Sequence, residues 1–329
     1  MSKIISPDSI NEMPWEDRPL DCKSPLWRYS GNPVIKRNPN NTCARVYNSA
    51  FVKFNGEFVG VFRGDGIDGI AKLYVGHSKD AINFEIDDEP ISFINEEGKI
   101  DNTNWQYDPR VIKLEDKYYV VWCDEFNNFP SLGIATTKDF KTFTKLNRPF
   151  LPANRNGVLF PKKINGYYAM LNRPSDGLHT RFGDIYISYS PDLEFWGKHK
   201  VVLKSGGKEW WRAIKIGAGP TPIELDDGWL VFTHGVGDNC NGFVYSIGAV
   251  ILDKNDPSKV LLDCSPYLLT PEADYEIKAF TDNVLFPTCT LFDKETGRIA
   301  IYYGAADTYT CIAFTTLDIL LDYMKKHAR

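Results

Sequence analysis

Charged residues interrupt several apolar, strand-like segments of the sequence, and such positions could carry chemistry. Asp108 stands in the segment YDPRVIKL, and Lys215 stands in AIKIGAGP. A charge inside an apolar strand is costly unless it is paired or contacts a ligand. Two structural interpretations stay open beside a functional one. Asp108 could pair with Arg110 at a strand end, and Lys215 could be a surface lysine on a loop.

Basic residues gather at equivalent positions of successive segments. The candidates for holding an anion are Arg155, Arg173, Lys215 and His234. A single histidine is more often structural than functional, and this holds for His179 and His234. The convergence of four such residues beside one acid is what favours a site.

The number of carboxylates separates the possible reactions. An inverting glycosidase uses two carboxyl groups, about 6.5–9.5 Å apart, to protonate the leaving group and to activate water. Only Asp108 supplies a carboxylate here, because the other inner segments begin NSAF, NGVLFP, GAGPTP and NVLFP. One acid beside a cationic cluster fits an anionic nucleophile, inorganic phosphate, which needs Arg and Lys rather than a general base.

The elements that position these residues repeat along the chain. A Ser/Thr-x-Asp turn, followed four residues later by an aromatic residue, occurs around Asp80, Asp139 and Asp192, with a degenerate copy at residues 252–257. Between the copies lie pairs of apolar runs joined by tight turns such as Asn-Gly, which is a strong hairpin signal. Five units of four short strands predict an all-β fold, a five-bladed β-propeller in one domain over residues 1–329.

The two ends of the chain complete this prediction. Residues 1–40 read as an N-terminal arm that packs across the blades and supplies the strand missing from the last unit. Residues 316–329 read as a C-terminal helix, because Thr316 can cap it and Leu317, Leu320, Leu321 and Met324 recur with helical spacing.

Composition excludes several classes of protein. The 38 basic and 43 acidic residues give a net charge of −5, which offers no general attraction for nucleic acid. We expect a cytoplasmic protein without membrane contact, because no apolar run could span a bilayer and the N-terminus lacks a signal peptide. Seven widely spaced cysteines and five histidines show no metal motif, so we expect no metal and no cofactor.

Long segments of the chain resemble one known family. The segments are YNSAF, VFRGD, YDPRV, NRNGVLFPKKINGYYAMLNRPSD, FGDI, KIGAGPTP, HGV, CNGFVYS and KETGRIAIYYGAAD. They are similar to the mannoside phosphorylases of glycoside hydrolase family 130, from about Trp15 to the final helix. The resemblance implies a five-bladed propeller that transfers a β-mannosyl unit to phosphate with inversion, giving α-mannose 1-phosphate.

The resemblance also implies roles for individual residues. Asp108 matches the proton donor, which is thought to act through the mannose 3-hydroxyl. Phosphate would be held by Arg155, Asn156, Arg173, Lys215, His234 and Tyr245. The sugars would be held by Asn48, Ser49, Arg63 and Asp65 on the mannosyl side and by Tyr107, His179, Phe243, Phe286 and Asp307 on the acceptor side. Phe243 stands where a tyrosine is expected, so one acceptor-side hydrogen bond would be missing.

The expected reaction is inverting phosphorolysis of β-1,4-mannosides from the non-reducing end, on mannooligosaccharides or on mannosyl-N-acetylglucosamine from N-glycan cores. No row of further aromatics in the sequence suggests a grip on a long chain, so we expect removal of one mannosyl unit at a time. We also expect a homo-oligomer. A β-1,2-mannoside phosphorylase, a hydrolase with Asp65, Asp124 or Asp307 as base, and a non-catalytic glycan-binding propeller stay open.

Overall fold

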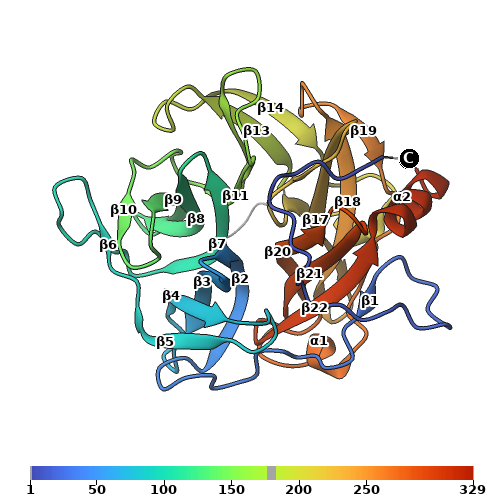
Figure 1. Ribbon diagram of the computed structural model, residues 1–329, viewed down its shortest axis with the longest axis horizontal. Coiled ribbons are helices and arrows are strands. Elements are labelled where there is room, and N and C mark those ends of the chain that lie inside the picture. Colours follow the sequence, from blue (N-terminus) through green and yellow to red (C-terminus); the bar gives the residue numbers. More distant parts are fainter. Residues whose placement is uncertain (1, 176–182, 329) are drawn as a thin grey trace.

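Five small sheets stand around a common axis in the computed structural model, which describes residues 2–175 and 183–328 (Figure 1). Four sheets follow one another along the chain, and the first contains β2 (Arg45–Phe54), β3 (Glu57–Asp65), β4 (Ala71–Ser78) and β5 (Glu85–Pro90). The second sheet contains β7 (Gln106–Leu114), β8 (Lys117–Phe126), β9 (Phe129–Thr137) and β10 (Phe143–Lys145), and the third contains β11 (Asn154–Leu159), β12 (Tyr168–Pro174), β13 (Ile185–Ser190) and β14 (Gly197–Leu203). The fourth sheet contains β15 (Lys215–Ala218), β16 (Ile223–Glu224), β17 (Gly228–Asn239), β18 (Gly242–Asp253) and β19 (Val260–Asp263). A two-residue strand, β6 (Phe93–Ile94), extends the second sheet. The prediction of a five-bladed propeller is confirmed.

The N-terminal arm closes the ring. The fifth sheet holds β20 (Leu285–Asp293), β21 (Arg298–Ala305) and β22 (Tyr309–Thr316), and its outer strand is β1 (Trp27–Arg28). Trp27 pairs with Phe314 in an antiparallel register. The chain therefore joins its two ends within one blade, as the strand count predicted.

The C-terminal helix begins where the sequence predicts it. Helix α2 spans Leu317–Lys326, and the Ile319 N–H donates to the Thr316 hydroxyl over 3.3 Å. Its apolar face is buried against the fourth and fifth blades. Two short elements were not predicted, a 3₁₀ helix at Trp210–Arg212 and helix α1 at Asp274–Ile277. No helix in the described ranges is long and apolar enough to cross a membrane.

The repeated turn has the same hydrogen bonds in each copy. In the second copy the Thr137 hydroxyl accepts from the Phe140 N–H, and the Asp139 carboxylate accepts from the Lys141 and Thr142 N–H groups. The Asp80 and Asp192 turns form the equivalent bonds. The side chains thus replace backbone partners at the β4–β5, β9–β10 and β13–β14 connections.

Aromatic rings fill the spaces between neighbouring blades. Phe51 of the first blade lies 4.7 Å from Tyr302 of the fifth, and Phe54 lies 5.5 Å from Tyr118 of the second. Phe160, which follows β11, lies 5.1 Å from Trp229 of the fourth blade. These contacts fix the spacing of the blades and hence of the inner strands that carry the candidate residues.

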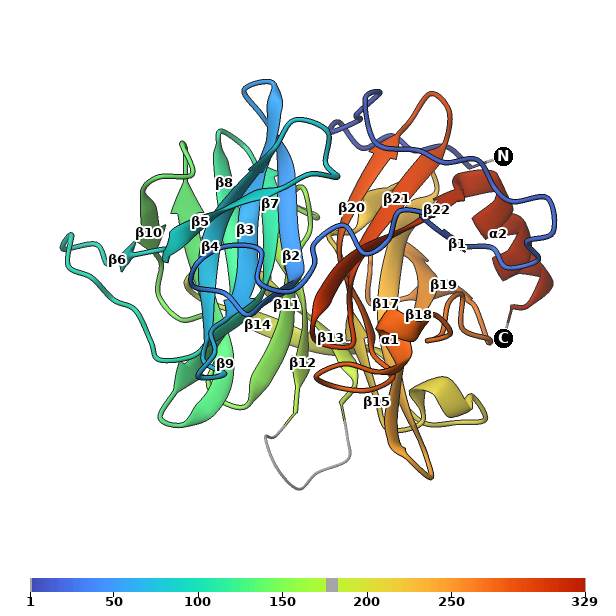
Figure 2. The same cartoon turned by 90° about the horizontal axis from the view of Figure 1, so that it is seen from below.

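The first residues of the chain cross one end of the propeller. The Ile5 N–H donates to the Glu224 carbonyl, the Ile10 N–H donates to the Phe292 carbonyl, and Glu12 pairs with Lys53. Figure 2 shows this segment beside the β20–β21 end of the fifth blade. These contacts lie near the C-terminal ends of the inner strands. The arm therefore covers one end of the channel, and the N-terminal ends of the inner strands lie at the other.

Candidate active site

Three inner strands carry the same distortion at their beginnings. The pairing of β2 with β3 shifts between Tyr47 and Ala50, and equivalent bulges follow Tyr107 in β7 and Arg155 in β11. Each bulge holds a residue with positive φ: Asn48 (48°), Asp108 (52°) and Asn156 (56°). Asn and Asp tolerate this conformation better than other non-glycine residues. Bulges change the direction of a side chain, and they are common beside active sites.

Asp108 is paired with residues of the first blade. Its Oδ1 accepts a hydrogen bond from Arg63 Nη1 over 2.9 Å and another from Asn48 Nδ2 over 2.9 Å. Arg110 instead donates to the backbone carbonyls of Asp108, Pro109 and Gly219. The interpretation in which Asp108 and Arg110 pair at a strand end is therefore wrong, because the bulge turns the two side chains to different partners.

Asp65 holds Arg63 from the other side. Arg63 Nε donates to Asp65 Oδ1 over 2.9 Å, and the Tyr47 hydroxyl and Arg45 Nη2 both contact Asp65 Oδ2. Sequence reasoning placed Asn48, Arg63, Asp65 and Asp108 together, and the structure does bring them together. It missed Arg45 and Tyr47, although both precede Asn48 on the same strand. The Ser49 hydroxyl donates to the Tyr47 carbonyl, so it also helps to hold this turn of the strand.

The basic residues gather on the third and fourth blades. Arg173 pairs with Arg155 across β11 and β12, and Arg173 Nη1 lies 3.0 Å from His234 Nε2. The Nε atoms of both arginines are buried without a hydrogen-bond partner among the described residues. Lys215 begins β15 opposite Val236, so it belongs to a strand and not to a surface loop.

The charges of this cluster act on one another. Burial, followed by the nearby Arg173, Arg110 and Lys215 cations, holds the pKa of His234 well below its ordinary value. Burial also lowers the pKa of Arg173, while Tyr245 opposes this effect and Arg155 adds to it. His234 is therefore a neutral imidazole among cations. An anion bound at this point would relieve the repulsion and would meet donors that need no rearrangement.

Little space is left between these residues. A Cβ atom on Gly217 would lie 2.4 Å from the His234 ring and 2.9 Å from Arg173 Nη1, and one on Gly183 would lie 3.0 Å from Arg173 Cδ and 3.3 Å from Lys215 Cγ. These two glycines allow the backbone to approach the cluster closely. Their role is thus to make room for the basic side chains.

The predicted acceptor-side residues are spread more widely. Tyr107 is a hydrogen-bond partner of Arg155, and burial raises its pKa. Phe286 is buried with its ring 4.2 Å from that of His234, which places it beside the basic cluster. Tyr245 stacks on His234 at 6.3 Å. Phe243 is half exposed, at the tip between β17 and β18. His179 lies outside the described residues.

The remaining acids have different surroundings. Asp124 is fully buried and engaged by Lys145, Arg148 and Thr103, so it is part of a structural network. Asp307 has positive φ in the β21–β22 turn, and burial raises its pKa against the influence of Arg63. Of the three bases considered for a hydrolase, Asp65 and Asp124 are thus neutralised by cations. No group of three or more His, Cys, Asp and Glu side chains in the described ranges could hold a metal ion.

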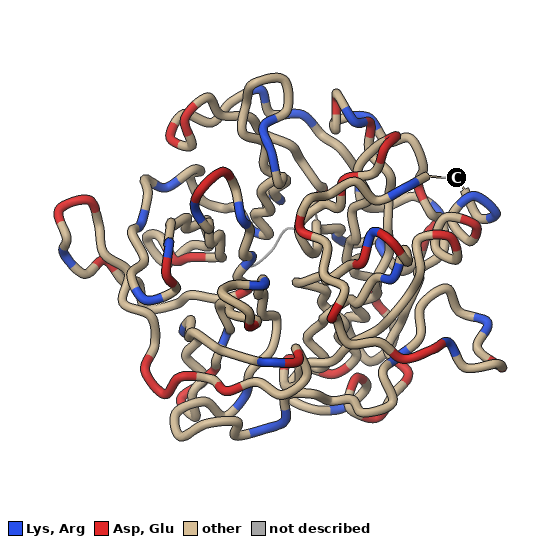
Figure 3. Tube along the Cα trace, viewed as in Figure 1, with Lys and Arg blue, Asp and Glu red and all other residues tan. Residues whose placement is uncertain are grey.

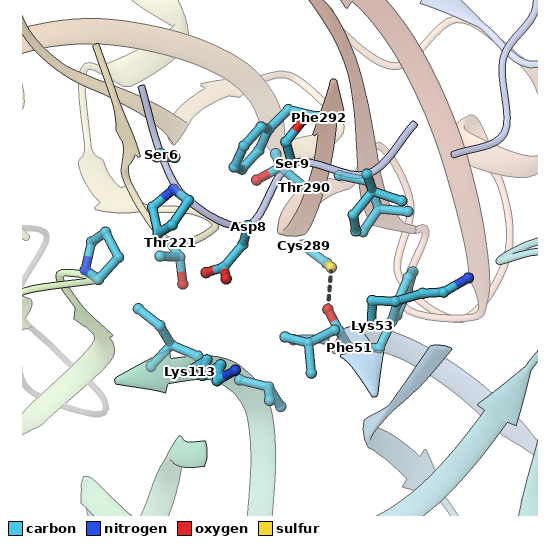
Figure 4. Close-up of a pocket in the computed structure, with 18 of the residues that line it drawn as sticks. Ser6, Asp8, Ser9, Phe51, Lys53, Lys113, Thr221, Cys289, Thr290 and Phe292 are labelled. Atoms are coloured by element: carbon cyan, nitrogen blue, oxygen red, sulfur yellow. Dashed lines mark hydrogen bonds between the residues drawn. The ribbon is translucent and has the colours of Figure 1, made fainter. Parts of the chain in front are cut away.

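A separate cavity lies away from these residues. It measures about 510 Å³ and is bounded by the N-terminal arm and by the far ends of the inner strands (Figure 4). Lys53 and Lys113 line it, whereas Asn48 and Asp108 stand five residues earlier on the same strands. Five residues of strand span about 16 Å. The cavity and the candidate site are therefore at opposite ends of the channel.

Charge is mixed over the rest of the molecule. Figure 3 shows basic and acidic residues interspersed along the whole trace. The excess of positive charge at Arg155, Arg173 and Lys215 is consequently a local property of the site. It is not part of a basic face.

Comparison with known proteins agrees with this geometry. The family described as beta-1,4-mannooligosaccharide phosphorylase, glycoside hydrolase family 130, matches residues 6–326. A beta-1,4-mannooligosaccharide phosphorylase of Ruminococcus albus is 49% identical over 333 aligned positions, which cover 99% of both chains. A 1,2-beta-oligomannan phosphorylase of Thermoanaerobacter is 34% identical and covers 88% of this chain and 96% of its own length.

Solved structures share the fold. A beta-1,2-mannobiose phosphorylase from Listeria innocua, in complex with beta-1,2-mannobiose, superposes with a TM-score of 0.80. The alignment covers 92% of this chain and 99% of the other, at 24% identity. At that identity the likeness supports the propeller fold alone.

Proposed function

The chain belongs to glycoside hydrolase family 130, and from this premise we propose that it phosphorolyses β-1,4-mannosides, releasing α-mannose 1-phosphate from the non-reducing end. The observation that carries the proposal is the position of one carboxylic acid, Asp108, beside a basic cluster: its charge acts on Arg155, which lies opposite Arg173, and Arg173 in turn contacts His234. An enzyme that activated water would instead need a second carboxylate as base.

The bond changes follow from the two halves of the site. A phosphate oxygen, held by Arg155, Arg173, Lys215 and His234, attacks the anomeric carbon of the terminal mannosyl unit. The bond from that carbon to the glycosidic oxygen breaks, and the leaving oxygen receives a proton that originates from Asp108. Attack from the face opposite the leaving group converts the β-mannoside into the α-phosphate. No cofactor is needed, because phosphate is itself the second substrate.

The neighbours of Asp108 suit this role. Arg63 and Asn48 both contact Oδ1, which leaves the other carboxyl oxygen to face the sugar. Asn48, Arg63 and Asp65 would orient the mannosyl hydroxyls. Neutral His234 would donate one hydrogen bond to phosphate without adding a positive charge to those of Arg155, Arg173 and Lys215.

The β-1,4 linkage is favoured over the β-1,2 linkage by the degree of similarity. The β-1,4-specific relative is 49% identical, whereas the β-1,2-acting relative given above is 34% identical. We extend the proposal to mannosyl-N-acetylglucosamine from N-glycan cores as a second substrate, to a cytoplasmic location and to a homo-oligomeric state. Light scattering of the purified protein tests the last of these.

One assay tests the reaction. Mannobiose with a β-1,4 bond is incubated with and without inorganic phosphate, and mannose 1-phosphate is measured. We expect release that depends on phosphate. Free mannose as the only product would indicate a hydrolase, and the absence of any product would indicate a glycan-binding protein. Release from β-1,2-mannobiose but not from β-1,4-mannobiose would overturn the linkage.

Replacement of Arg173 tests the phosphate site. Arg173→Ala removes donors that act on the anion, so we expect the KM for phosphate to rise at least tenfold while the KM for mannobiose changes much less. Lys141→Ala, on an exposed turn, is the control. Equal changes in both KM values would assign Arg173 to the fold or to the sugar.

A further inference from the structure

A buried arginine crosses the channel beside the candidate site. Arg110 belongs to β7 of the second blade and is 1% exposed. Its Nη1 donates to the carbonyl of Asp108 over 3.0 Å and to that of Pro109 over 3.2 Å, and its Nε donates to the carbonyl of Gly219. Gly219 follows β15 of the fourth blade, and the third blade lies between these two in the ring (Figure 1). The side chain therefore bridges two blades that are not neighbours.

The two ends of this bridge belong to the two halves of the site. At one end, the Asp108 carbonyl lies in the bulge of β7, which sets the direction of the Asp108 side chain. At the other end, the Gly219 N–H donates to the Phe232 carbonyl over 2.9 Å, and a Cβ atom on Gly219 would lie 3.0 Å from Pro287 Cγ. Gly219 is thereby fixed in place directly after the strand that begins with Lys215.

The bridge is costly as a purely structural contact. A guanidinium group taken out of water loses its solvation, and neutral carbonyls return less of this free energy than a carboxylate would. Burial lowers the pKa of Arg110, while the Asp108 charge opposes this effect. The Nη2 atom is also buried without a hydrogen-bond partner among the described residues. A task at the site explains such a residue better than the stability of the fold does.

The charge of Arg110 also acts on the candidate phosphate site. Its guanidinium carbon lies 5.6 Å from the centroid of the Phe286 ring, and that ring lies 4.2 Å from the ring of His234. The Arg110 cation is one of the charges that lower the pKa of His234. One side chain thus contacts the backbone of the proton donor, the end of the strand of Lys215 and the surroundings of His234.

We propose that Arg110 is a positioning residue, which holds the proton donor Asp108 at a fixed distance from the phosphate-binding strand β15. This inference rests on the proposed function. Phosphorolysis needs the attacking phosphate oxygen, the anomeric carbon and the proton donor to be aligned together, and a displacement of about 1 Å can lower the rate about 10²-fold. Arg110 does not contact the substrate, and it acts through the placement of Asp108.

The test separates position from charge. Arg110→Lys keeps the positive charge, but lysine has no planar fork that could bond three carbonyls. We expect kcat for mannobiose to fall about 10²-fold, while the KM values for phosphate and mannobiose change by less than about threefold. Arg148→Lys is the matched control. Arg148 also donates to backbone carbonyls, but within the structural network of Asp124, so this variant should keep its kcat.

A double-mutant comparison shows whether Arg110 acts through Asp108. Asp108→Asn already lacks the proton donor, so adding Arg110→Lys to it should lower the remaining rate by no more than about twofold. An equal loss of rate in both backgrounds would overturn the proposal. A higher KM for phosphate with an unchanged kcat would also overturn it, because Arg110 would then belong to the phosphate site. A lower thermal midpoint without a lower kcat would assign Arg110 to the fold alone.

The other end of the bridge supplies a second variant in case Arg110→Lys does not fold. Gly219→Ala places a methyl group against Pro287 and displaces the carbonyl that accepts from Arg110. We expect kcat to fall here as well, with little change in either KM, and an unchanged kcat overturns the proposal. Phosphorolysis itself is measured on the wild-type enzyme, so its failure is seen separately from a failure of the Arg110 inference.

Discussion

Asp108 has an unfavourable backbone conformation, and its carboxylate accepts hydrogen bonds from two side chains. Its φ of 52° is stabilised by the bulge of β7, and Arg63 and Asn48 hold its carboxylate. Asn is similar in shape and also tolerates positive φ, so Asp108→Asn should fold normally. It has no proton to donate, and we expect turnover of mannobiose to fall by about 10²–10⁴-fold or more.

The measurement for Asp108→Asn is the rate of phosphorolysis under saturating substrates, with circular dichroism and the thermal midpoint as controls for folding. If the variant kept more than about a tenth of wild-type turnover, Asp108 would be a structural residue of the strand end.

His234 should make stability depend on pH. Its pKa is lowered in the folded protein, by burial first, so below its ordinary value near 6.5 the unfolded chain binds a proton that the folded protein does not. Stability contributed by the neutral imidazole is therefore present above that pH and is lost as the pH falls, by up to about 1.4 kcal/mol per pH unit.

Urea unfolding at pH 7.5, 6.0 and 5.0 measures this dependence. His234→Gln cannot take up the proton, so its unfolding free energy should fall less steeply between pH 6.0 and 5.0 than that of wild type. If the unfolding free energies of wild type and His234→Gln changed equally with pH, the imidazole would titrate alike in the folded and unfolded states.

At the scale of the elements, the repeated turn sets how each outer strand begins. Asp139 accepts from the Lys141 and Thr142 N–H groups, each over 2.8 Å. Asp139→Ala leaves both donors to water, and we expect the unfolding free energy to fall by about 1 kcal/mol. The comparison is Asp116→Ala, which removes only an exposed pair with Lys138 and should change stability much less. A loss in Asp116→Ala as large as that in Asp139→Ala would argue against a special role for the turn.

The strand bulges place polar residues of three inner strands at the candidate site. Without the extra residue in β2, β7 and β11, Asn48, Asp108 and Asn156 would follow the regular alternation of the pleat. The bulges give three neighbouring blades a polar residue at one end of the channel, while the N-terminal arm covers the cavity at the other end.

At the scale of the whole molecule, the ring is closed by two residues of the arm. Trp27 is buried, pairs with Phe314 and contacts Trp15 at 5.4 Å. Trp27→Ala should lower the unfolding free energy by about 3–5 kcal/mol, because it leaves a cavity where the first and last parts of the chain meet. Chemical denaturation measures the loss, and Leu20→Ala, at a fully exposed position of the same arm, is the matched control. A small effect of Trp27→Ala would mean that the propeller is closed without β1.

Local signals in the sequence determined the blades, the capped helix and the set of polar residues. Asn-Gly turns, the Thr/Ser-x-Asp turn and the Thr316 cap act over a few residues, and alternation fixes which side chains enter the core, so these could be predicted. Only the tertiary structure decided that Asp108 pairs with Arg63 and not with Arg110, and that Arg110 bridges the second and fourth blades. These contacts join different blades, and their geometry depends on bulges and on the closure of the ring, which no short stretch of sequence specifies.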